Sequence, residues 1–263
     1  MRLTVLGRAS VLAAGVMMAT ACDVVFAQKV SETVNKTVPL PSGGTLKLHN
    51  FSGDVKITAT NGRDVVIKAV READRDRLDH IKLEIETSGS TVTIEANKRD
   101  ESWSKSVTDN NVVHTTFDIQ VPASAMLDID VFSSDLTIAG VTGKQNLKTF
   151  SGTIAVTGAK AAVTAEAFSG EIEVEAKAAG ANPELNLSTF SGNIKGLLAD
   201  SVKGAVSFDS FSGHFNSEIP LAVQSTSRSR NARGRTSDSR ADTASAGSTL
   251  YFHTFSGNVK VTK

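Results

Sequence analysis

The sequence predicts an all-β protein folded as a β-solenoid, in which successive coils of the chain stack along one axis. Three observations predict this fold class. The tripeptide Phe-Ser-Gly recurs along the chain, apolar residues alternate with polar ones on both sides of it, and a Gly stands where the chain turns. Each repeat is therefore expected to be a strand, a tight turn and a second strand.

The repeat is centred on phenylalanine. Seven of the twelve Phe residues begin Phe-Ser-Gly or, at Phe132, the variant Phe-Ser-Ser; they are Phe51, Phe132, Phe150, Phe168, Phe190, Phe211 and Phe255. From Phe132 onward, successive copies are 18, 18, 22, 21 and 44 residues apart. The last interval corresponds to two periods, or to one period with an insertion.

The residues around each Phe follow a period of two. Five and three positions before it the residues are mostly apolar, as in Leu127 and Ile129, and one position before it they are mostly small or β-branched. Four positions after it another apolar residue follows, such as Ile154. The Gly of the motif allows positive φ or close backbone approach. Ser134, which replaces it in the variant copy, predicts a slightly different corner.

A solenoid and an antiparallel meander both fit such units, and the solenoid is favoured because equivalent residues then stack about 4.8 Å apart. Outward charges alternate in sign at Asp130, Lys148 and Glu166, and at Glu173 and Lys195, with about 0.2–1 kcal/mol expected for each pair. We expect the Phe-Ser-Gly corners to stack, with the Phe rings in register inside one elongated core, at roughly 1.5–3 kcal/mol per buried ring.

Residues 28–126 are less regular than the repeats in residues 127–263. Their strand-like segments are Thr45–Leu48, Val55–Thr58, Val65–Val70, Ile81–Ile85, Thr91–Glu95 and Val113–Val121. The polar segment Arg71–His80 is either a short helix or a loop, and the charged stretch Asn97–Asn111, which contains Trp103, is predicted to be a loop. We expect this half to form wider coils or a small sheet that continues the core and covers one end.

Residues 225–248 interrupt the repeats. This segment is rich in Ser, Thr, Ala and Arg, and its five Arg against two Asp give it a net charge of +3. We expect a solvated, mobile insertion. The alternative is an electrostatic contact with phosphate-bearing lipid, glycan or cell-wall polymer.

The N-terminus indicates export. Two Arg residues precede an apolar run over residues 9–21, and small residues follow. We favour a signal peptide of residues 1–27, cleaved after Ala27 to leave a chain that begins at Gln28. The tetrapeptide that ends at Cys22 is similar to a bacterial lipobox, in which Cys22 would carry a lipid anchor. No later stretch approaches the length of a membrane span, so the mature protein is expected in the periplasm, on the cell surface or secreted.

Composition and motifs narrow the function. The 28 basic and 28 acidic residues give no electrostatic reason to expect nucleic acid as a partner. The single Cys excludes an internal disulfide framework and any multi-Cys metal site. Phosphate-cradling Gly loops, zinc-binding His-Glu-x-x-His helices and Gly-x-Ser-x-Gly elbows are absent from the sequence. We therefore assign no catalytic, cofactor-binding or metal-ligating residue.

Two polar groupings still deserve a structural test. His49 and His253 hold equivalent places in the first and last copies, and we expect them to lie too far apart to share a metal. His214 and Asp209 are close in sequence, but a surface His is seldom a ligand.

The second grouping is acidic. Asp128, Asp130 and Asp135 could bind Ca²⁺ or supply the acid and base of a glycan-cleaving solenoid. A structural role is favoured, because Lys148 is a ready partner for Asp130.

Taken together, these features resemble bacterial exported "putative adhesin" domains of unknown function, related to head-domain putative adhesins. The resemblance rests on the export signal, the segment Leu46–Val55, the run Val121-Pro122-Ala123 leading into Leu127–Asp130, and the later Ser-Gly-x-Ile units; it covers residues 30–263. It implies a right-handed, single-stranded β-helix-like domain over residues 28–263, without enzymatic activity or an established ligand.

Three functional hypotheses follow. The first is a non-catalytic structural or adhesion and recognition module of the cell envelope, whose partner is an unknown glycan or protein. The second is a glycan-active enzyme that uses the Asp128–Asp135 cluster. The third is a lipid-anchored accessory of an envelope-signalling system, for which Cys22 is the sole motivation.

Overall fold

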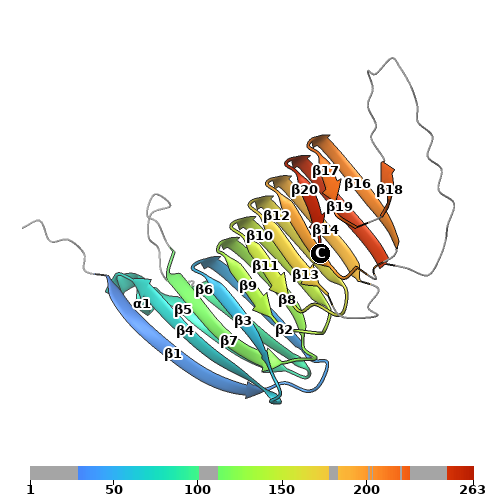
Figure 1. The fold of residues 1–263 in the computed structure, drawn as a ribbon. Coiled ribbons are helices and arrows are strands. Elements are labelled where there is room, and N and C mark those ends of the chain that lie inside the picture. Colours follow the sequence, from blue (N-terminus) through green and yellow to red (C-terminus); the bar gives the residue numbers. More distant parts are fainter. Residues whose placement is uncertain are drawn as a thin grey trace, which may run out of the picture.

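The structure, a computed structural model, describes residues 29–100, 112–177, 183–200, 202, 204–219, 221–225 and 248–263. The signal peptide with Cys22, Trp103 and nearly all of the Arg-rich insertion lie outside the described residues. Within them, the strands form two ten-stranded sheets. Successive coils follow one another like steps in Figure 1. The described residues include no helix that is long and apolar enough to cross a membrane.

The two sheets are defined here by their strand order. Sheet A runs β1 (Val30–Pro39), β4 (Asp64–Ala73), β7 (His114–Pro122), β3 (Val55–Thr60), β9 (Leu136–Ala139), β11 (Ile154–Thr157), β13 (Ile172–Ala176), β15 (Ile194–Leu198), β20 (Val259–Thr262) and β17 (Phe215–Ser217). Sheet B runs β18 (Ala222–Ser225), β16 (Gly204–Ser212), β19 (Ser248–Ser256), β14 (Glu184–Ser191), β12 (Val163–Ser169), β10 (Gln145–Ser151), β8 (Met126–Ser133), β2 (Thr45–Ser52), β6 (Thr91–Arg99) and β5 (Ile81–Ser88).

Each Phe-centred repeat contributes one strand to each sheet. The strand before the Phe-Ser-Gly motif lies in sheet B and the strand after it in sheet A, so β10 pairs with β8 and β12 while β11 pairs with β9 and β13. These pairs are parallel and in register: Leu147 faces Ile129 on one side and Ala165 on the other. The all-β class with long, mostly parallel sheets is therefore confirmed, and the parallel pairing is that of a solenoid rather than of a meander.

The coils are not stacked in chain order at either end. The coil β2–β3 lies between β6–β7 and β8–β9, although β6 and β7 follow it in sequence. Likewise the last coil, β19–β20, lies between β14–β15 and β16–β17. The 44-residue interval before Phe255 thus corresponds to a return of the chain, which places the final coil one position inside the preceding one.

The core lies between the sheets and consists of the alternate residues that the period of two selects. In β8 these are Leu127, Ile129 and Val131, and one buried cluster continues from Val38 to Val261. The expectation that the motif Phe rings lie in this core is wrong, because all seven are at least 42% exposed. The residue before each Phe points inward, and successive strand residues point to opposite faces, so the ring itself must point outward.

The corner glycines make the close stacking of coils possible. The amide N–H groups of Gly152, Gly170 and Gly192 each donate to a serine carbonyl of the next coil, at 3.2, 3.1 and 3.0 Å respectively. These residues have φ of +139°, +155° and +154°. A Cβ on Gly192 would lie 1.8 Å from the carbonyl oxygen of Gly170, so a side chain does not fit there. In the variant corner, Ser134 still donates its N–H to Ser151 at 3.0 Å.

Antiparallel strands cover the N-terminal end, as expected for this half. β4 pairs antiparallel with β7, and β1 continues the sheet antiparallel to β4, while β5 pairs antiparallel with β6 on the other sheet. The segment Arg71–His80 is divided between the end of β4 and the one-turn-and-a-half helix α1 (Arg75–His80), whose N-terminus is capped by the Asp74 carboxylate. The loop predicted from Asn97 begins later, because β6 continues to Arg99; residues 101–111 lie outside the described ranges.

Candidate functional site

The seven motif Phe rings form one continuous stack, here called the Phe column, along the edge where the chain passes from sheet B to sheet A. Its spatial order is Phe51, Phe132, Phe150, Phe168, Phe190, Phe255 and Phe211. Neighbouring ring centroids are 4.6–4.9 Å apart, with interplanar angles of 1–11°. The spacing is that of adjacent strands, so parallel, in-register pairing alone brings the rings into contact.

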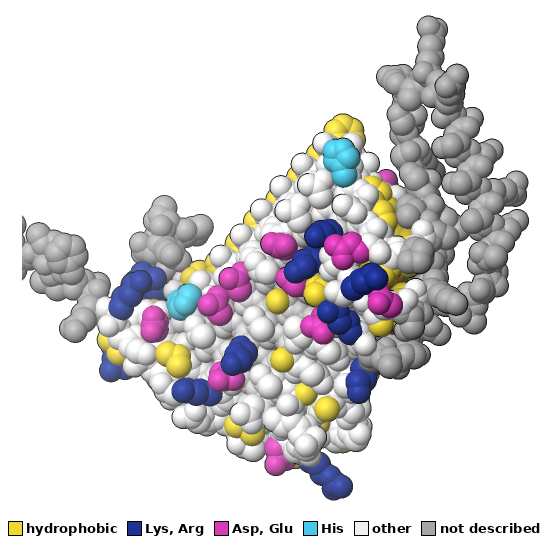
Figure 2. Space-filling view, viewed as in Figure 1, with side chains coloured by type: hydrophobic (Ala, Val, Ile, Leu, Met, Phe, Trp, Pro, Cys, Tyr) yellow, Lys and Arg dark blue, Asp and Glu magenta, His cyan; other side chains and the backbone are white. Residues whose placement is uncertain are grey.

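The Phe column is half-buried by its own members. Six of its rings are 42–48% exposed, whereas Phe211, at the C-terminal end of the stack, is 81% exposed. In a stack of parallel rings the faces cover one another and the edges remain open, so the surface presents a row of aromatic edges. Figure 2 shows hydrophobic side chains following this edge of the stepped part of the molecule. Contiguous exposed apolar strips are typical of interaction surfaces, so the Phe column is a candidate for one.

Beside the Phe column, on the outer face of sheet B, runs a line of polar side chains; seven of its eight members stand two residues before a motif Phe, and Glu95 of β6 extends the line beyond His49. We call it the polar row; in spatial order it comprises Glu95, His49, Asp130, Lys148, Glu166, Ser188, His253 and Asp209. With neutral His residues, the row carries four carboxylates and one ammonium. Its strand register places each member directly opposite the next.

The surface is hollowed where the Phe column and the polar row meet. One hollow of about 540 Å³ is lined by residues of β6, β2 and β8, and a second of about 480 Å³ by residues of β8, β10, β12, β14 and β19. Both are lined by Asp130, Val131 and Phe132, so they adjoin at β8; the two hollows together are here called the aromatic groove. It runs across the strands, parallel to the solenoid axis.

Three pairs of neighbouring side chains in the polar row lie within 4 Å of each other. Lys148 Nζ is 3.4 Å from Glu166, His49 Nε2 is 3.8 Å from Glu95, and His253 Nδ1 is 3.5 Å from Asp209. All of these side chains are 43–53% exposed, so water screens the pairs and they contribute little to stability.

Asp130 is the exception in the row. The ion pair expected between Asp130 and Lys148 does not form: the two residues face each other in register, but the ammonium lies on Glu166 instead. Among the described residues, the Asp130 carboxylate has no ion-pair or hydrogen-bond partner. It therefore leaves an open acceptor at the point where the two hollows join.

The acidic cluster proposed from the sequence is only partly brought together: Asp128 and Asp130 share the outer face of β8, whereas Asp135 lies after the corner. The Asp128 carboxylate lies 3.5 Å from Lys47 Nζ and accepts a hydrogen bond of 2.9 Å from the Asn146 amide. Asp135, beyond the Phe column, accepts the Thr153 N–H at 2.7 Å. Of the three acidic residues, Asp130 alone lines the aromatic groove.

The histidines are also placed as expected. His49 on β2 and His253 on β19 are separated by five strand spacings, or roughly 24 Å at the usual spacing. Asp209 pairs with His253 rather than with His214. Within the described residues, there is no group of three or more His, Cys, Asp or Glu side chains that could hold a metal ion.

The second predicted charge pair forms on the opposite sheet, outside the groove. Lys195 Nζ lies 2.8 Å from Glu173 Oε1, on the outer face of sheet A. The hydrogen bond to Glu173 raises the pKa of Lys195, because it stabilises the charged form. This pair confirms that equivalent positions of neighbouring coils lie side by side.

Sequence reasoning missed the aromatic groove, although a signal for it was present. Leu127, Ile129 and Val131 point inward, so Asp130 and Phe132 must share the outer face. The same parity at every repeat places the Phe column beside the polar row. The prediction was wrong because it treated a large apolar residue as buried without counting its position in the strand.

The chain is similar to a crystal structure titled a putative cell adhesion protein from Clostridium sporogenes (10% identity, 88% of this chain and 99% of that chain covered, TM-score 0.47). A second is titled a putative adhesin from Bacteroides fragilis (10% identity, 88% and 97% covered, TM-score 0.35). A third is titled a putative lipid binding protein from Parabacteroides distasonis (13% identity, 88% and 97% covered, TM-score 0.31).

No curated protein matches the chain. A family model, described as Toastrack DUF4097, matches residues 37–262, which include both sheets from the end of β1 to the end of β20. Since this match spans most of the sequence, the chain belongs to the Toastrack DUF4097 family.

Proposed function

We propose that the protein is a non-catalytic recognition module of the bacterial cell envelope that binds an extended glycan along the aromatic groove. The observation that carries this proposal is the Phe column itself, a continuous row of half-exposed ring edges beside a row of polar groups. A saccharide chain has the matching chemistry, because its C–H surfaces pack on apolar edges while its hydroxyls bond to carboxylate, ammonium and hydroxyl groups.

The shape of the groove supports a polymer over a compact ligand. Its two hollows follow one another along the solenoid axis, and six ring spacings of about 4.7 Å give the Phe column a length of roughly 28 Å. The ring faces are covered by their neighbours, so a sugar would pack against a line of edges rather than on one aromatic platform. Asp130 would supply the open acceptor near the middle of the path.

The polar groups of the groove also favour binding over catalysis. A glycan-cleaving site of the usual kind needs two carboxylates on opposite sides of the scissile bond, in surroundings that separate their pKa values. Here Asp128 and Asp135 are engaged by Lys47, Asn146 and Thr153 outside the groove.

The proposed address rests on the sequence. The signal over residues 1–27 would export the chain, and the mature protein from Gln28 would act in the periplasm, on the cell surface or after secretion. If Cys22 were lipidated instead, the module would be anchored. Mass spectrometry of the N-terminus of the exported protein distinguishes the two, because an unmodified Gln28 start excludes the anchor. We also propose the right-handed coil that the family resemblance implies.

Binding of the chain from Gln28 onward to immobilised envelope glycans tests the proposed function. Phe150→Leu keeps an apolar side chain but removes the ring edge, and Asp130→Asn removes the charge of the open acceptor; each is expected to weaken binding about tenfold. Tyr251→Leu is the matched control, since Tyr251 is 52% exposed on the same sheet but lines neither hollow.

Two results would overturn the proposal. The first is glycan binding that both groove variants leave unchanged. The second is polysaccharide cleavage by the purified protein that Asp130→Asn abolishes, which would establish an enzyme. If the protein instead bound a protein ligand with the same dependence on Phe150 and Asp130, the aromatic groove would remain the binding site and the ligand would be a protein rather than a glycan.

A further inference from the structure

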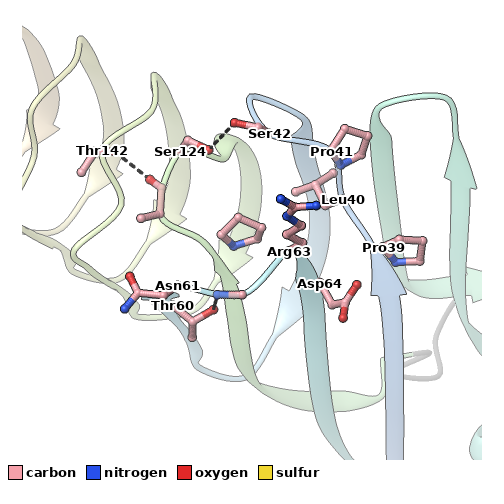
Figure 3. Close-up of a pocket in the computed structure, with 13 residues that line it drawn as sticks. Pro39, Leu40, Pro41, Ser42, Thr60, Asn61, Arg63, Asp64, Ser124 and Thr142 are labelled. Carbon is pink, nitrogen blue, oxygen red and sulfur yellow. Dashed lines mark hydrogen bonds between the residues drawn. The ribbon is translucent and has the colours of Figure 1, made fainter.

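A separate hollow lies at the opposite edge of the coils, where the chain returns from sheet A to sheet B. It has a volume of about 870 Å³ and is formed by four connections: β1 to β2, β3 to β4, β7 to β8 and β9 to β10 (Figure 3). None of its lining residues belongs to the aromatic groove. An inference about it is therefore independent of the proposed function.

The walls of this hollow are held together by backbone hydrogen bonds between the connections. Leu40 N–H donates to the Arg63 carbonyl at 3.0 Å, Ala123 N–H to the Thr60 carbonyl at 3.1 Å, and Thr142 N–H to the Ala123 carbonyl at 2.7 Å. Leu40 is 1% exposed and anchors its connection in the core. Because the connections are cross-linked in this way, the hollow is preformed and a ligand would not have to order it.

The cation of the hollow is Arg63. Its side chain extends from the β3–β4 connection toward Leu40 and Ser42, whereas the carboxylate of Asp64 points away from it (Figure 3). Among the described residues, the Arg63 guanidinium has no ion-pair or hydrogen-bond partner. A planar guanidinium with five donors in a fixed fork matches the two oxygens of a carboxylate.

Neutral polar and apolar groups complete the lining. The hydroxyls of Ser42 and Ser124 lie 3.2 Å apart, and since each has one proton and two lone pairs, their mutual bond leaves capacity for a ligand. The side-chain amide of Asn61 lies at the rim. The rings of Pro39, Pro41 and Pro122, also part of the lining, offer apolar surface and no N–H group.

We infer that this hollow binds a carboxylate group carried on a small, partly apolar body. Arg63 holds the carboxylate, the two serine hydroxyls and Asn61 bond to neighbouring polar atoms, and the proline rings cover the apolar part. A monoanion fits better than a phosphate, because the hollow contains one cation and Asp64 adjoins it in the chain. The carboxylate can come from an acidic sugar or from the free end of a short peptide.

Titrations followed by backbone amide NMR test the site. The probes are the methyl glycoside of glucuronic acid and N-acetylalanine, each compared with its methyl ester. One of the acids is expected to give saturable shifts at Ser42, Asn61 and Ser124, with a Kd in about the millimolar range. The methyl ester of that acid is expected to bind at least about tenfold more weakly. Which acid saturates identifies the source of the carboxylate.

Three variants assign the interaction to Arg63. Arg63→Gln removes the charge at similar size and should lower affinity as much as esterification does, while Arg63→Lys should restore part of it. Arg75→Gln is the control, because Arg75 is an exposed arginine of the same half that does not line the hollow. The inference fails if neither acid saturates, if acid and ester bind alike, or if Arg63→Gln binds like the unchanged protein. None of these outcomes bears on the aromatic groove.

Discussion

At the N-terminal end of the solenoid, the ten-residue strands β4 and β1 extend sheet A beyond its parallel part, and β5 does the same for sheet B. At the C-terminal end, sheet A finishes in the three-residue β17 and sheet B in the four-residue β18. Long antiparallel strands cover one end of the core, whereas the other end relies on short edge strands. Both devices limit edge-to-edge association.

The two ends share one feature despite this difference. At each end the coil nearest the chain terminus, β2–β3 or β19–β20, lies inside its sequence neighbour. Each of these coils therefore has a partner on both sides. At the C-terminal end the last residues belong to such a coil, so their fraying, common at chain termini, requires the outer coil to open first, whereas the N-terminal strand β1 is itself the edge of sheet A. The ends differ in how the outermost coil is covered: β6–β7 lies under β5 and β4, whereas among the described residues β16 is paired with β18 and β17 has no outer strand.

The largest expected effect distinguishes an inner corner from an outer one. A Cβ on Gly257 would lie 1.8 Å from the Gly192 carbonyl oxygen, and one on Gly213 would lie 1.9 Å from that of Gly257. Gly257 belongs to the coil β19–β20, which has a neighbouring coil on both sides, and has φ of +154°. Gly257→Ala should therefore destabilise the folded protein by about 4 kcal/mol or more. Gly213→Ala should cost about 1–2 kcal/mol, because β17, which follows Gly213, has no outer strand among the described residues and can move away.

Urea unfolding of the two alanine variants measures this difference. Gly43→Ala serves as a reference for backbone strain alone, since Gly43 has φ of +73° and nothing within 4 Å of an added Cβ. Equal losses for Gly257→Ala and Gly213→Ala would contradict the view that the outer coil is free to adjust.

The next effect tests the N-terminal cap. Arg71 on β4 is 4% exposed; its Nη1 lies 2.7 Å from Glu32 Oε2 on β1, and its Nη2 donates to the Ile81 carbonyl at the start of β5. One guanidinium thus joins the last strands of both sheets. Arg71→Met should cost about 2–4 kcal/mol, because it leaves the buried Ile81 carbonyl without its donor.

Hydrogen exchange shows where that loss falls. Amides of β1 and β5 should lose protection in Arg71→Met, while those of the C-terminal coils should not. Glu32→Gln is the control, since Glu32 is about half-exposed and an amide oxygen can still accept from Arg71; a small change is expected. Uniform loss of protection along the chain would show that the cap and the repeats unfold as one unit.

Sequence was sufficient for the repeating part of the fold. The Phe-centred period and the alternation around it define both strands of each coil, and parallel register follows because identical positions stack; Leu147 does face Ile129 and Ala165. The parity of Val131 and Phe132 would also have placed the rings on the surface. That inference depends on counting alternation rather than on hydrophobicity, which by itself favours burial.

The ends could not be derived in the same way. Equivalent coils have nearly the same strand pattern, so the pattern is compatible with β19 lying on either side of β16. The sequence did not predict β1. Val38 and Pro39 indicate only the end of a strand, and the other eight residues of β1 alternate weakly between apolar and polar types. The hollow at Arg63 combines four connections that are distant in sequence, and no local motif marks it.

The smallest expected effect compares an inner ring of the Phe column with its open end. Phe168 stacks between Phe150 and Phe190 at 4.7 and 4.9 Å, whereas Phe211 has a single neighbour, Phe255, at 4.8 Å. Phe168→Leu loses two stacked contacts and should cost about 1–2 kcal/mol, while Phe211→Leu loses one contact of a ring that is 81% exposed and should cost about 0.5 kcal/mol. Thermal unfolding of both variants measures the ratio of the two losses of stability.

If the two losses were equal, the stack would contribute through burial of each ring against its own coil rather than through ring-on-ring contact. If Phe211→Leu stabilised the protein, the open ring would be retained at a cost to stability, and a binding role for the uncovered C-terminal end would be the simplest reason to keep it.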